Sequence, residues 1–431
     1  MTADNSVNVR AVAADAVLEI LERGAYSHLL LRQVLAKYGY LSRQDRAFLT
    51  RLVQGTVERA IELDWMIGQY SSVPVKKLKP FIRSLLRISV YQLKYMRVPA
   101  SAVCNEAVKL AKKRHFAGLT GFVNGVLRKI SAELPNLPEQ EDWSLRYSMP
   151  PWLLEQWRKQ YPTEILQKML EGFYEKSARG LCVRCNLSLA SPEEVKALLE
   201  QEGVKAEADT ELPQVLWLQN MGNIEKLSAF SRGWFVVQDK SSVLAGLAAA
   251  PKPGSFCVDV CAAPGGKTLH LADQMRGSGL VESRDVSEEK CALIRENVLR
   301  CGFENVHISC WDAREFDGSL AGQADVLLAD LPCSGLGILG GKPDIKYRMN
   351  EEKQESLVLL QREILETIWQ YVKPGGRMIY STCTINRQEN EEQAAWICGR
   401  FPFRLVRDRQ YLPGVDGCDG FYIAELEREE I

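Results

Sequence analysis

Two cysteines stand just beyond the ends of apolar runs, where a thiol can meet a ligand. Cys333 follows the run 326–329 in ADVLLADLPCSGLG, and Cys383 follows the run 378–380 in RMIYSTCTIN. Ligands of open α/β sheets bind outside the carboxyl ends of the strands, so both thiols should face one crevice. A thiolate adds to an electrophilic carbon and can later leave, which suits covalent catalysis. Each cysteine taken alone could equally be a small buried residue.

A turn rich in small residues lies between an apolar run and a helix in FCVDVCAAPGGKTLHLA. It comprises Cys261, Ala262, Ala263, Pro264, Gly265, Gly266 and Lys267. Glycine lets the backbone approach a ligand closely, and a helix N-terminus offers N–H groups to an anion. The turn matches neither GxGxxG nor GxxxxGK[ST]. We expect it to hold a carboxylate or a phosphate.

Three acids follow successive apolar runs. Asp285 closes the second run, 20 residues after Gly265, where a carboxylate can accept both ribose hydroxyls of an adenosine cofactor. Asp312 in SCWDAR is placed to bond the adenine edge, and Asp330 ends the fourth run. Each acid alone could be a helix cap or a turn former. Three in consecutive turns favour a pocket for an adenosyl group.

The elements that must position these residues begin near 236. Short apolar runs at 256–261, 279–283, 306–310, 324–330, 377–381 and 420–426 alternate with helical patterns at 266–276, 288–301 and 351–371. This alternation is typical of a doubly wound, mostly parallel sheet. We therefore expect an α/β domain over 236–431.

Two modules precede that domain. Apolar residues recur at helical spacing up to about 133, which predicts an all-α domain over 1–138, ended by Pro135 and Pro138. Mixed patterns over 139–235 predict a small α+β module. One of its helices should begin with Ser191 as N-cap, Pro192 as first residue and Glu194 as the capping-box acid.

Charge and cysteine usage limit the class of protein. The net charge is −1, yet 76–129 holds 13 basic residues and one acid, Glu106, which favours a polyanionic partner. A solvated helical surface with its counter-charge elsewhere is the alternative. No apolar run is long enough for a membrane span or a signal peptide, and the 12 cysteines lack the spacing of a metal site or a disulfide framework. We expect a cytoplasmic monomer with no metal.

Five stretches in order resemble one enzyme family. DVCAAPGGKT, LADLPCSGLG and YSTCTINRQENEE resemble the S-adenosylmethionine, Pro-Cys and Thr-Cys motifs of the RNA 5-methylcytosine methyltransferases. GWFVVQDKSS and DGFYIAEL resemble flanking motifs of that family, and the basic helical module is similar to the NusB RNA-binding fold. The likeness extends over essentially the whole chain and points to the bacterial branch that acts on small-subunit rRNA.

The resemblance implies a Rossmann-like methyltransferase domain with S-adenosyl-L-methionine as cofactor. It implies methylation of cytosine C5 in 16S rRNA, at cytidine 967, on naked rRNA or an early assembly particle. Cys383 would be the nucleophile, Cys333 would assist elimination and RNA release, and Asp330 would hold the base near the methyl group. Residues 261–267 would surround the methionine part of the cofactor. Asp285 would bind its ribose, and Asp312 would bind its adenine.

Some points stay open at the level of sequence. Another RNA such as tRNA could be the substrate, and a non-catalytic assembly factor could keep the fold, although such a factor would be expected to have lost the cysteines or the acids. The family often has a basic run before Pro-Asp-Ile-Lys, where this chain has 339–342, Leu-Gly-Gly-Lys. A helix capped by Asn386, with Glu389 three residues on, is one candidate for lowering the pKa of Cys383.

Overall fold

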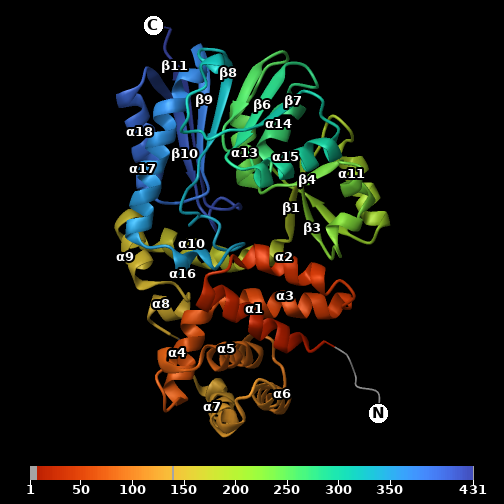
Figure 1. The fold of residues 1–431 in the computed structure, drawn as a ribbon, viewed down its shortest axis with the longest axis vertical. Helices are drawn as coiled ribbons and strands as arrows, with labels where there is room; N and C mark the ends of the chain where they lie inside the picture. Colours follow the sequence, from red (N-terminus) through yellow and green to blue (C-terminus); the bar gives the residue numbers. More distant parts are fainter. Residues whose placement is uncertain (1–6, 138–139, 431) are drawn as a thin grey trace. The chain divides into compact units, whose positions relative to one another are not determined.

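The computed structural model describes residues 7–137 and 140–430 (Figure 1). The chain divides into two compact units: Met1–Leu166 with Lys342–Arg348, and Gln167–Gly341 with Met349–Ile431. The predicted boundary between residues 138 and 139 lies outside the described residues. The division into 1–138, 139–235 and 236–431 therefore stays a proposal.

The first unit is helical, as predicted. Its helices are α1 (Val9–Arg23), α2 (Ser27–Lys37), α3 (Arg43–Glu58), α4 (Ala60–Tyr70), α5 (Pro80–Tyr95), α6 (Ala100–Lys113), α7 (Thr120–Glu133), α8 (Trp143–Arg146), α9 (Pro151–Gln160) and, from the inserted segment, α16 (Ile345–Arg348). Helix α5 packs against α1, α3, α4, α6 and α7. Most of its residues are buried, so it forms the centre of the helical core.

The basic residues of 76–129 divide into two groups. One group pairs with acids: Arg83 with Glu22, Arg87 with Glu22 and Asp64, Lys94 with Glu62, Arg114 with Asp15, and Lys109 with Glu106 of the same stretch. The other group is exposed: Lys76, Lys77, Lys79, Arg97, Lys112, Lys113, Arg128 and Lys129. Acidic partners thus balance part of the basic charge of 76–129. The remaining basic residues are exposed.

The segment Lys342–Arg348 packs into the first unit. The Lys346 ammonium donates to the Glu58 carbonyl at 2.7 Å, the Tyr347 hydroxyl donates to the Val57 carbonyl at 2.8 Å, and the Ser27 hydroxyl donates to Asp344. Burial lowers the pKa of Lys346 to about 7. Asp344 and Lys346 are both nearly inaccessible to solvent, so in this conformation they serve packing rather than contact with RNA.

The α+β module begins the second unit. Its antiparallel sheet has the order β2-β3-β1-β4, with β1 (Leu181–Cys185), β2 (Lys205–Ala208), β3 (Val215–Gln219) and β4 (Phe235–Val237). The helices are α10 (Thr163–Arg179), α11 (Pro192–Gln201) and α12 (Ser228–Ser231). The capping box predicted for α11 forms, since Ser191 and Glu194 bond to each other's backbone N–H groups.

A seven-stranded sheet forms the rest of this unit, in the order β10-β11-β9-β8-β5-β6-β7. The strands are β5 (Phe256–Asp259), β6 (Leu280–Asp285), β7 (Val306–Cys310), β8 (Ala324–Asp330), β9 (Val372–Thr382), β10 (Phe403–Tyr411) and β11 (Phe421–Arg428). Strands β5 to β9 are parallel, and β11 pairs antiparallel with both of its neighbours, β9 and β10. The doubly wound, mostly parallel sheet is confirmed.

Helices cover this sheet on both faces: α13 (Lys240–Ala249), α14 (Gly266–Gln274), α15 (Glu288–Cys301), α17 (Glu351–Ile368) and α18 (Glu391–Arg400). Figure 1 shows α17 and α18 beside the β9–β10 end, and α14 and α15 beside β6 and β7. Consecutive residues of β8 pack into different hydrophobic clusters, Val326 into one and Leu327 into the other. This period of two is what a central strand requires.

The order of strands reverses between β8 and β5, because the chain moves outward in one direction through β6 and β7 and in the other through β8 and β9. Ligands bind at such a reversal. Strand β10 was not predicted: it lies at the sheet edge, and most of its side chains are exposed, four of them charged.

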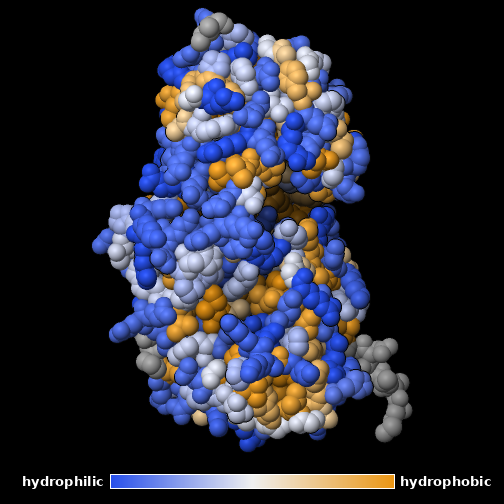
Figure 2. Space-filling view, turned by 60° about the vertical axis from the view of Figure 1, so that its left-hand side comes forward, coloured by the Kyte–Doolittle hydropathy of each residue, from blue (hydrophilic) through white to orange (hydrophobic). Residues whose placement is uncertain are grey.

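Hydrophilic residues cover most of the face in Figure 2, with apolar residues gathered in patches. Within the described part of the chain, every helix is too short or too polar to cross a membrane.

Candidate active site

The two thiols predicted to share a crevice meet at the sheet's carboxyl edge. Asp330 ends β8 opposite Ser381 of β9, so the loops that follow these neighbouring strands emerge side by side. Cys333 and Cys383 lie in these loops, both half-buried, with their Sγ atoms 3.3 Å apart. That distance suits a hydrogen bond and exceeds the roughly 2.05 Å of a disulfide. The hydrogen bond with Cys383, and then burial, raise the pKa of the Cys333 thiol well above its ordinary value.

A lysine–aspartate ion pair lies beside the thiols. Lys267, in the first turn of α14, places Nζ 2.7 Å from Oδ2 of Asp330, and the hydroxyl of Ser381 donates to Oδ1 at 2.8 Å. The ammonium also lies 5.2 Å from the centre of the Phe421 ring. Burial disfavours the charge on Lys267, but Asp330, Asp259 and Cys383 together raise its pKa. The Lys267 ammonium therefore remains charged within the electrostatic reach of Cys383.

The turn 261–267 approaches a neighbouring helix closely. Gly265 has a φ of +103°, and a Cβ there would lie 3.3 Å from the Ile294 side chain, so glycine suits both the backbone and the space. Cys261 sits at the start of the turn, where burial, followed by Asp285, raises the pKa of its thiol. A neutral Cys261 is suited to packing against a ligand rather than attacking one.

Asp285 is tied to this turn. Its carboxylate accepts from the N–H groups of Ala263 at 2.9 Å and Val286 at 2.8 Å, and from the Lys290 ammonium at 2.9 Å. The Lys290 side chain is half exposed and can move aside. Since a carboxylate has about four acceptor positions, the arrangement fits ribose hydroxyls.

Asp312 lies just after β7, as predicted, but its carboxylate is engaged in the structure. The Arg314 guanidinium donates to Asp312 at 2.6 Å, and hydrogen bonds from the side chain and backbone of Arg314 lower the pKa of that carboxyl. This pair is at the surface, so a ligand that used Asp312 would have to replace Arg314.

The candidate helix N-terminus behind Cys383 is only a three-residue 3₁₀ turn, Arg387–Glu389. Such a turn carries little of the dipole of a long helix. The Glu389 side chain, moreover, points to the hydroxyl and backbone N–H of Ser334, at 2.5 and 2.8 Å. Asn386 caps this turn as predicted, since its side chain accepts from the Gln388 N–H, but the turn is too short to account for an ionised Cys383, and Lys267 is a cation near that thiol.

Two glycines hold the thiol loops together through backbone contacts. The N–H of Gly337 donates to the Cys383 carbonyl at 3.1 Å, and the Gly420 N–H donates to the Gly337 carbonyl at 2.9 Å. A Cβ on Gly337 would lie 1.9 Å from the Gly420 carbonyl oxygen. No side chain larger than hydrogen fits there without moving the loop after Cys333.

Comparisons with known proteins agree along the chain. Family models match 246–427 (16S rRNA methyltransferase RsmB/F), 7–132 (NusB family) and 149–225 (the ferredoxin-like domain of RsmF/B-like methyltransferases). The probable ribosomal RNA small subunit methyltransferase B of Bacillus subtilis is 36% identical, over 98% of this chain and 99% of that protein. The ribosomal RNA small subunit methyltransferase B of Proteus mirabilis is 33% identical, over 98% and 99%.

The chain belongs to the ribosomal RNA small subunit methyltransferase B family. The solved structure of PH0851 is similar over 98% of this chain and 99% of its own, with 27% identity and a TM-score of 0.84. A Rossmann-like methyltransferase domain after NusB-like and ferredoxin-like modules is thus confirmed, and S-adenosyl-L-methionine is the cofactor.

Several residues that shape the site of this rRNA methyltransferase were missed in the sequence. Ser381 and Thr384 stand beside Cys383 in YSTCT, so their position was a usable signal. Ser334 and Gln361 meet Glu389, which was expected only as a capping acid, in a buried network behind the thiols, and Gln361 comes from the middle of α17, where the sequence gives no signal. Within the described residues, no cluster of His, Cys, Asp and Glu could hold a metal ion.

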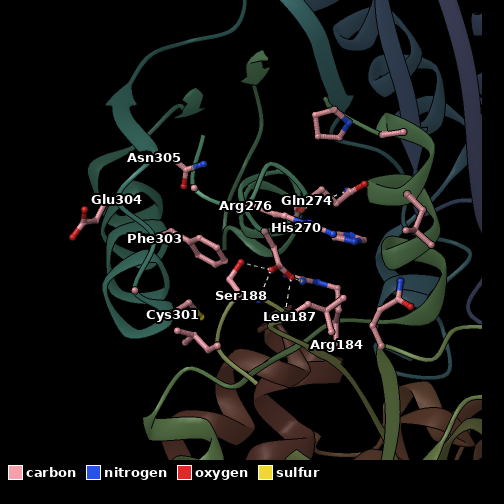
Figure 3. Close-up of a pocket in the computed structure, with 18 residues that line it drawn as sticks. Arg184, Leu187, Ser188, His270, Gln274, Arg276, Cys301, Phe303, Glu304 and Asn305 are labelled. Atoms are coloured by element: carbon pink, nitrogen blue, oxygen red, sulfur yellow. Dashed lines mark hydrogen bonds and ion pairs between the residues drawn. The ribbon is translucent and has the colours of Figure 1, made fainter. Parts of the chain in front are cut away.

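A cavity of about 820 Å³ in the same unit lies away from this chemistry. It is lined by residues from the middle of α14 onward, including His270, Gln274 and, just beyond the helix, Arg276, whereas the cofactor turn is at the start of that helix (Figure 3). Figure 3 also shows Arg184 and Ser188 on its lower side, where both bond to Asp273 at 2.8 and 2.7 Å. These contacts join β1 and its following loop to α14.

Proposed function

We propose that this methyltransferase transfers a methyl group to C5 of one cytidine in 16S rRNA, cytidine 967 by family resemblance, through a covalent cysteine adduct. The observation that carries the proposal is the thiol pair, with 3.3 Å between Cys333 and Cys383, beside the Lys267–Asp330 pair. Membership of the family supports rRNA as the substrate class. The two thiols at one site support C5 methylation, which needs one thiol to add to C6 and a second to assist elimination.

C5 of cytosine is a weak nucleophile, so the ring must first be activated. The Cys383 thiolate adds to C6, and the electrons of the C5–C6 double bond then make C5 enamine-like. Lys267 favours this thiolate by its charge. Asp330 would hold the N3 and N4 edge of the base, which fixes C5 beside the methyl donor.

Product formation requires the adduct to break. Once C5 carries the methyl group, its proton passes to water, the electrons of the C5–H bond re-form the C5–C6 double bond, and the Cys383 sulfur departs with the electrons of its bond to C6. Cys333, at hydrogen-bond distance from Cys383, would assist this elimination and RNA release. The elevated pKa of Cys333 keeps it a thiol, which can give its proton to the departing sulfur and regain one from water.

The cofactor fits the residues at the carboxyl edge. S-Adenosyl-L-methionine supplies an electrophilic methyl group on a sulfonium when bound. Residues 261–267 would hold its methionine part, Asp285 its ribose and Asp312 its adenine. The observations that support this fit are the tight turn at Gly265 and the Asp285 carboxylate, whose partner Lys290 is half exposed.

The substrate would reach the crevice as an unpaired base. Sequence-specific recognition of RNA usually targets bases splayed out of a helix or presented in a loop. The exposed basic residues of α6 and α7, such as Lys112 and Lys129, would give salt-dependent affinity for the phosphates. We infer a cytoplasmic monomer that acts on naked 16S rRNA or an early small-subunit particle.

Transfer of tritium from labelled S-adenosyl-L-methionine tests the proposal. We expect small-subunit rRNA to be labelled at one cytidine, and bulk tRNA to serve as the negative control. Cys383→Ala should abolish labelling, whereas Cys333→Ala should accumulate protein bound to RNA. Normal turnover by Cys383→Ala, or labelling of tRNA but not rRNA, would overturn the proposal.

A further inference from the structure

A buried carboxylate joins the two loops that carry the thiols. Glu389 is fully buried and accepts from the backbone N–H of Ser334 at 2.8 Å and from its hydroxyl at 2.5 Å. The Ser334 hydroxyl also lies 2.7 Å from that of Thr384. Ser334 directly follows Cys333, and Thr384 directly follows Cys383, so the network connects the neighbours of both thiols.

The Glu389 carboxylate is surrounded by donors. Besides Ser334, the side-chain amides of Asn386 and Gln361 donate to it at 3.0 and 3.2 Å. Four donors directed at two carboxylate oxygens favour the ionised form, because each of them stabilises negative charge. Burial raises the pKa of Glu389, while these hydrogen bonds oppose the rise.

The thiol pair therefore lies between opposite charges. Lys267, from α14, acts on Cys383, whereas Glu389, from the turn before α18, acts on Cys333. Further titratable groups near the pair are Asp330 from β8, whose pairing with Lys267 weakens but does not cancel the effect of that lysine on Cys383, and Tyr380 from β9, whose hydroxyl donates to the Glu389 carbonyl at 2.5 Å. Helix α17 contributes the neutral Gln361.

We propose that Glu389 is a positioning residue: it fixes the loop of Cys333 against that of Cys383 and keeps the proton shared by the two thiols on Cys333. Its negative charge penalises a thiolate at Cys333, so the thiolate forms at Cys383. This assignment deepens the proposed function, on which its catalytic consequence rests. The two cysteines thus acquire separate roles from their surroundings, although the thiols themselves are chemically alike.

Site-resolved alkylation tests the assignment without RNA. Wild-type protein is treated with a limiting amount of iodoacetamide between pH 6 and 9, and peptides are quantified by mass spectrometry. Alkylation follows the thiolate fraction, so we expect Cys383 to react first in the wild type. In Glu389→Gln, the ratio of Cys333 to Cys383 labelling should rise about tenfold, the change that one pKa unit produces.

Two variants serve as controls. Glu392→Gln removes an exposed acid three residues on and should leave the ratio unchanged. Ser334→Ala removes the hydroxyl contact but keeps the backbone N–H, and should raise the ratio by a smaller factor. It also provides a test should Glu389→Gln fail to fold. An unchanged labelling ratio in a folded Glu389→Gln or Ser334→Ala variant would overturn the proposal.

Steady-state methylation gives the second readout. Glu389→Gln should lower kcat about tenfold while KM for rRNA stays near the wild-type value, because the group does not touch RNA. Glu389→Asp, which keeps the charge, should recover part of kcat. If wild-type protein methylates no rRNA while the labelling ratio still responds to Glu389, the proposed substrate is wrong and the charge assignment stands.

Discussion

Replacing Lys267 by Met tests the electrostatics of the site. Met preserves much of the length and volume of the side chain and removes the charge that lies 2.7 Å from Asp330. At an effective dielectric constant of 20, the pair interaction at that distance is about 6 kcal/mol before desolvation. Breaking a buried pair typically costs about 3–5 kcal/mol. The Asp330 side chain is 27% exposed, so we expect the lower end of that range.

The same substitution should act on catalysis. If about 3 kcal/mol of the lost interaction applies to the transition state, methyl transfer slows by roughly 100-fold. A single-turnover assay with saturating rRNA and labelled cofactor measures this rate, and urea unfolding measures the stability. Lys267→Arg keeps the charge and should retain more activity than Met. A Met variant within threefold of the wild-type rate would refute the view that Lys267 supports the thiolate and orders Asp330.

Three further predictions follow from the same site. Burial raises the pKa of Asp259 to about 7 from 3.8, so between these pH values the folded state keeps a proton that the unfolded state loses. The free energy of unfolding of the wild type should therefore fall as the pH rises from 4 to 7. Relative to Asp259→Asn, we expect a loss of up to about 4 kcal/mol. Gly337→Ala should abolish methylation and cost about 1–3 kcal/mol in urea unfolding, because its Cβ meets the Gly420 carbonyl. Diamide should oxidise Cys333 and Cys383 to a disulfide, being itself reduced to the hydrazine, and should inactivate the enzyme until dithiothreitol is added.

Each of these has an outcome that contradicts it. A difference between wild type and Asp259→Asn that is constant with pH would place the buried proton elsewhere. Gly337→Ala with normal turnover would show that the loop can shift freely; Gly399→Ala, where a Cβ has nothing within 4 Å, is the control. After diamide, full alkylation of both thiols by iodoacetamide would rule out the disulfide.

Local patterns in the sequence predicted the elements that carry the cofactor residues. The helix at 288–301 was predicted from its pattern with the bounds of α15, and in the structure Ser287 caps its start and Gly302 ends it. Asp285 and Asp330 were placed correctly at strand ends, since apolar runs mark buried parallel strands. Parallel strands bring such ends to one edge, which is why two thiols 50 residues apart could be expected to meet.

Features that depend on tertiary contacts could not be predicted. Strand β10 is an edge strand whose charged residues do not alternate with apolar ones. The segment Lys342–Arg348 looks like part of a surface loop, yet Lys346 and Tyr347 find their partners in α3, almost 290 residues earlier. The position of Glu389 in the sequence suggested a local capping box. In the structure its carboxylate instead accepts hydrogen bonds from Ser334 and Gln361, which are distant in the sequence.

Mapping the protein–RNA adduct tests the central claim most directly. Small-subunit rRNA containing 5-azacytidine, which blocks release because its C5 is replaced by nitrogen, is incubated with enzyme and cofactor, then digested and analysed by mass spectrometry. We expect one nucleotide attached to the peptide that contains Cys383. Attachment at Cys333, or efficient methylation of normal rRNA with no adduct at either cysteine, would contradict it.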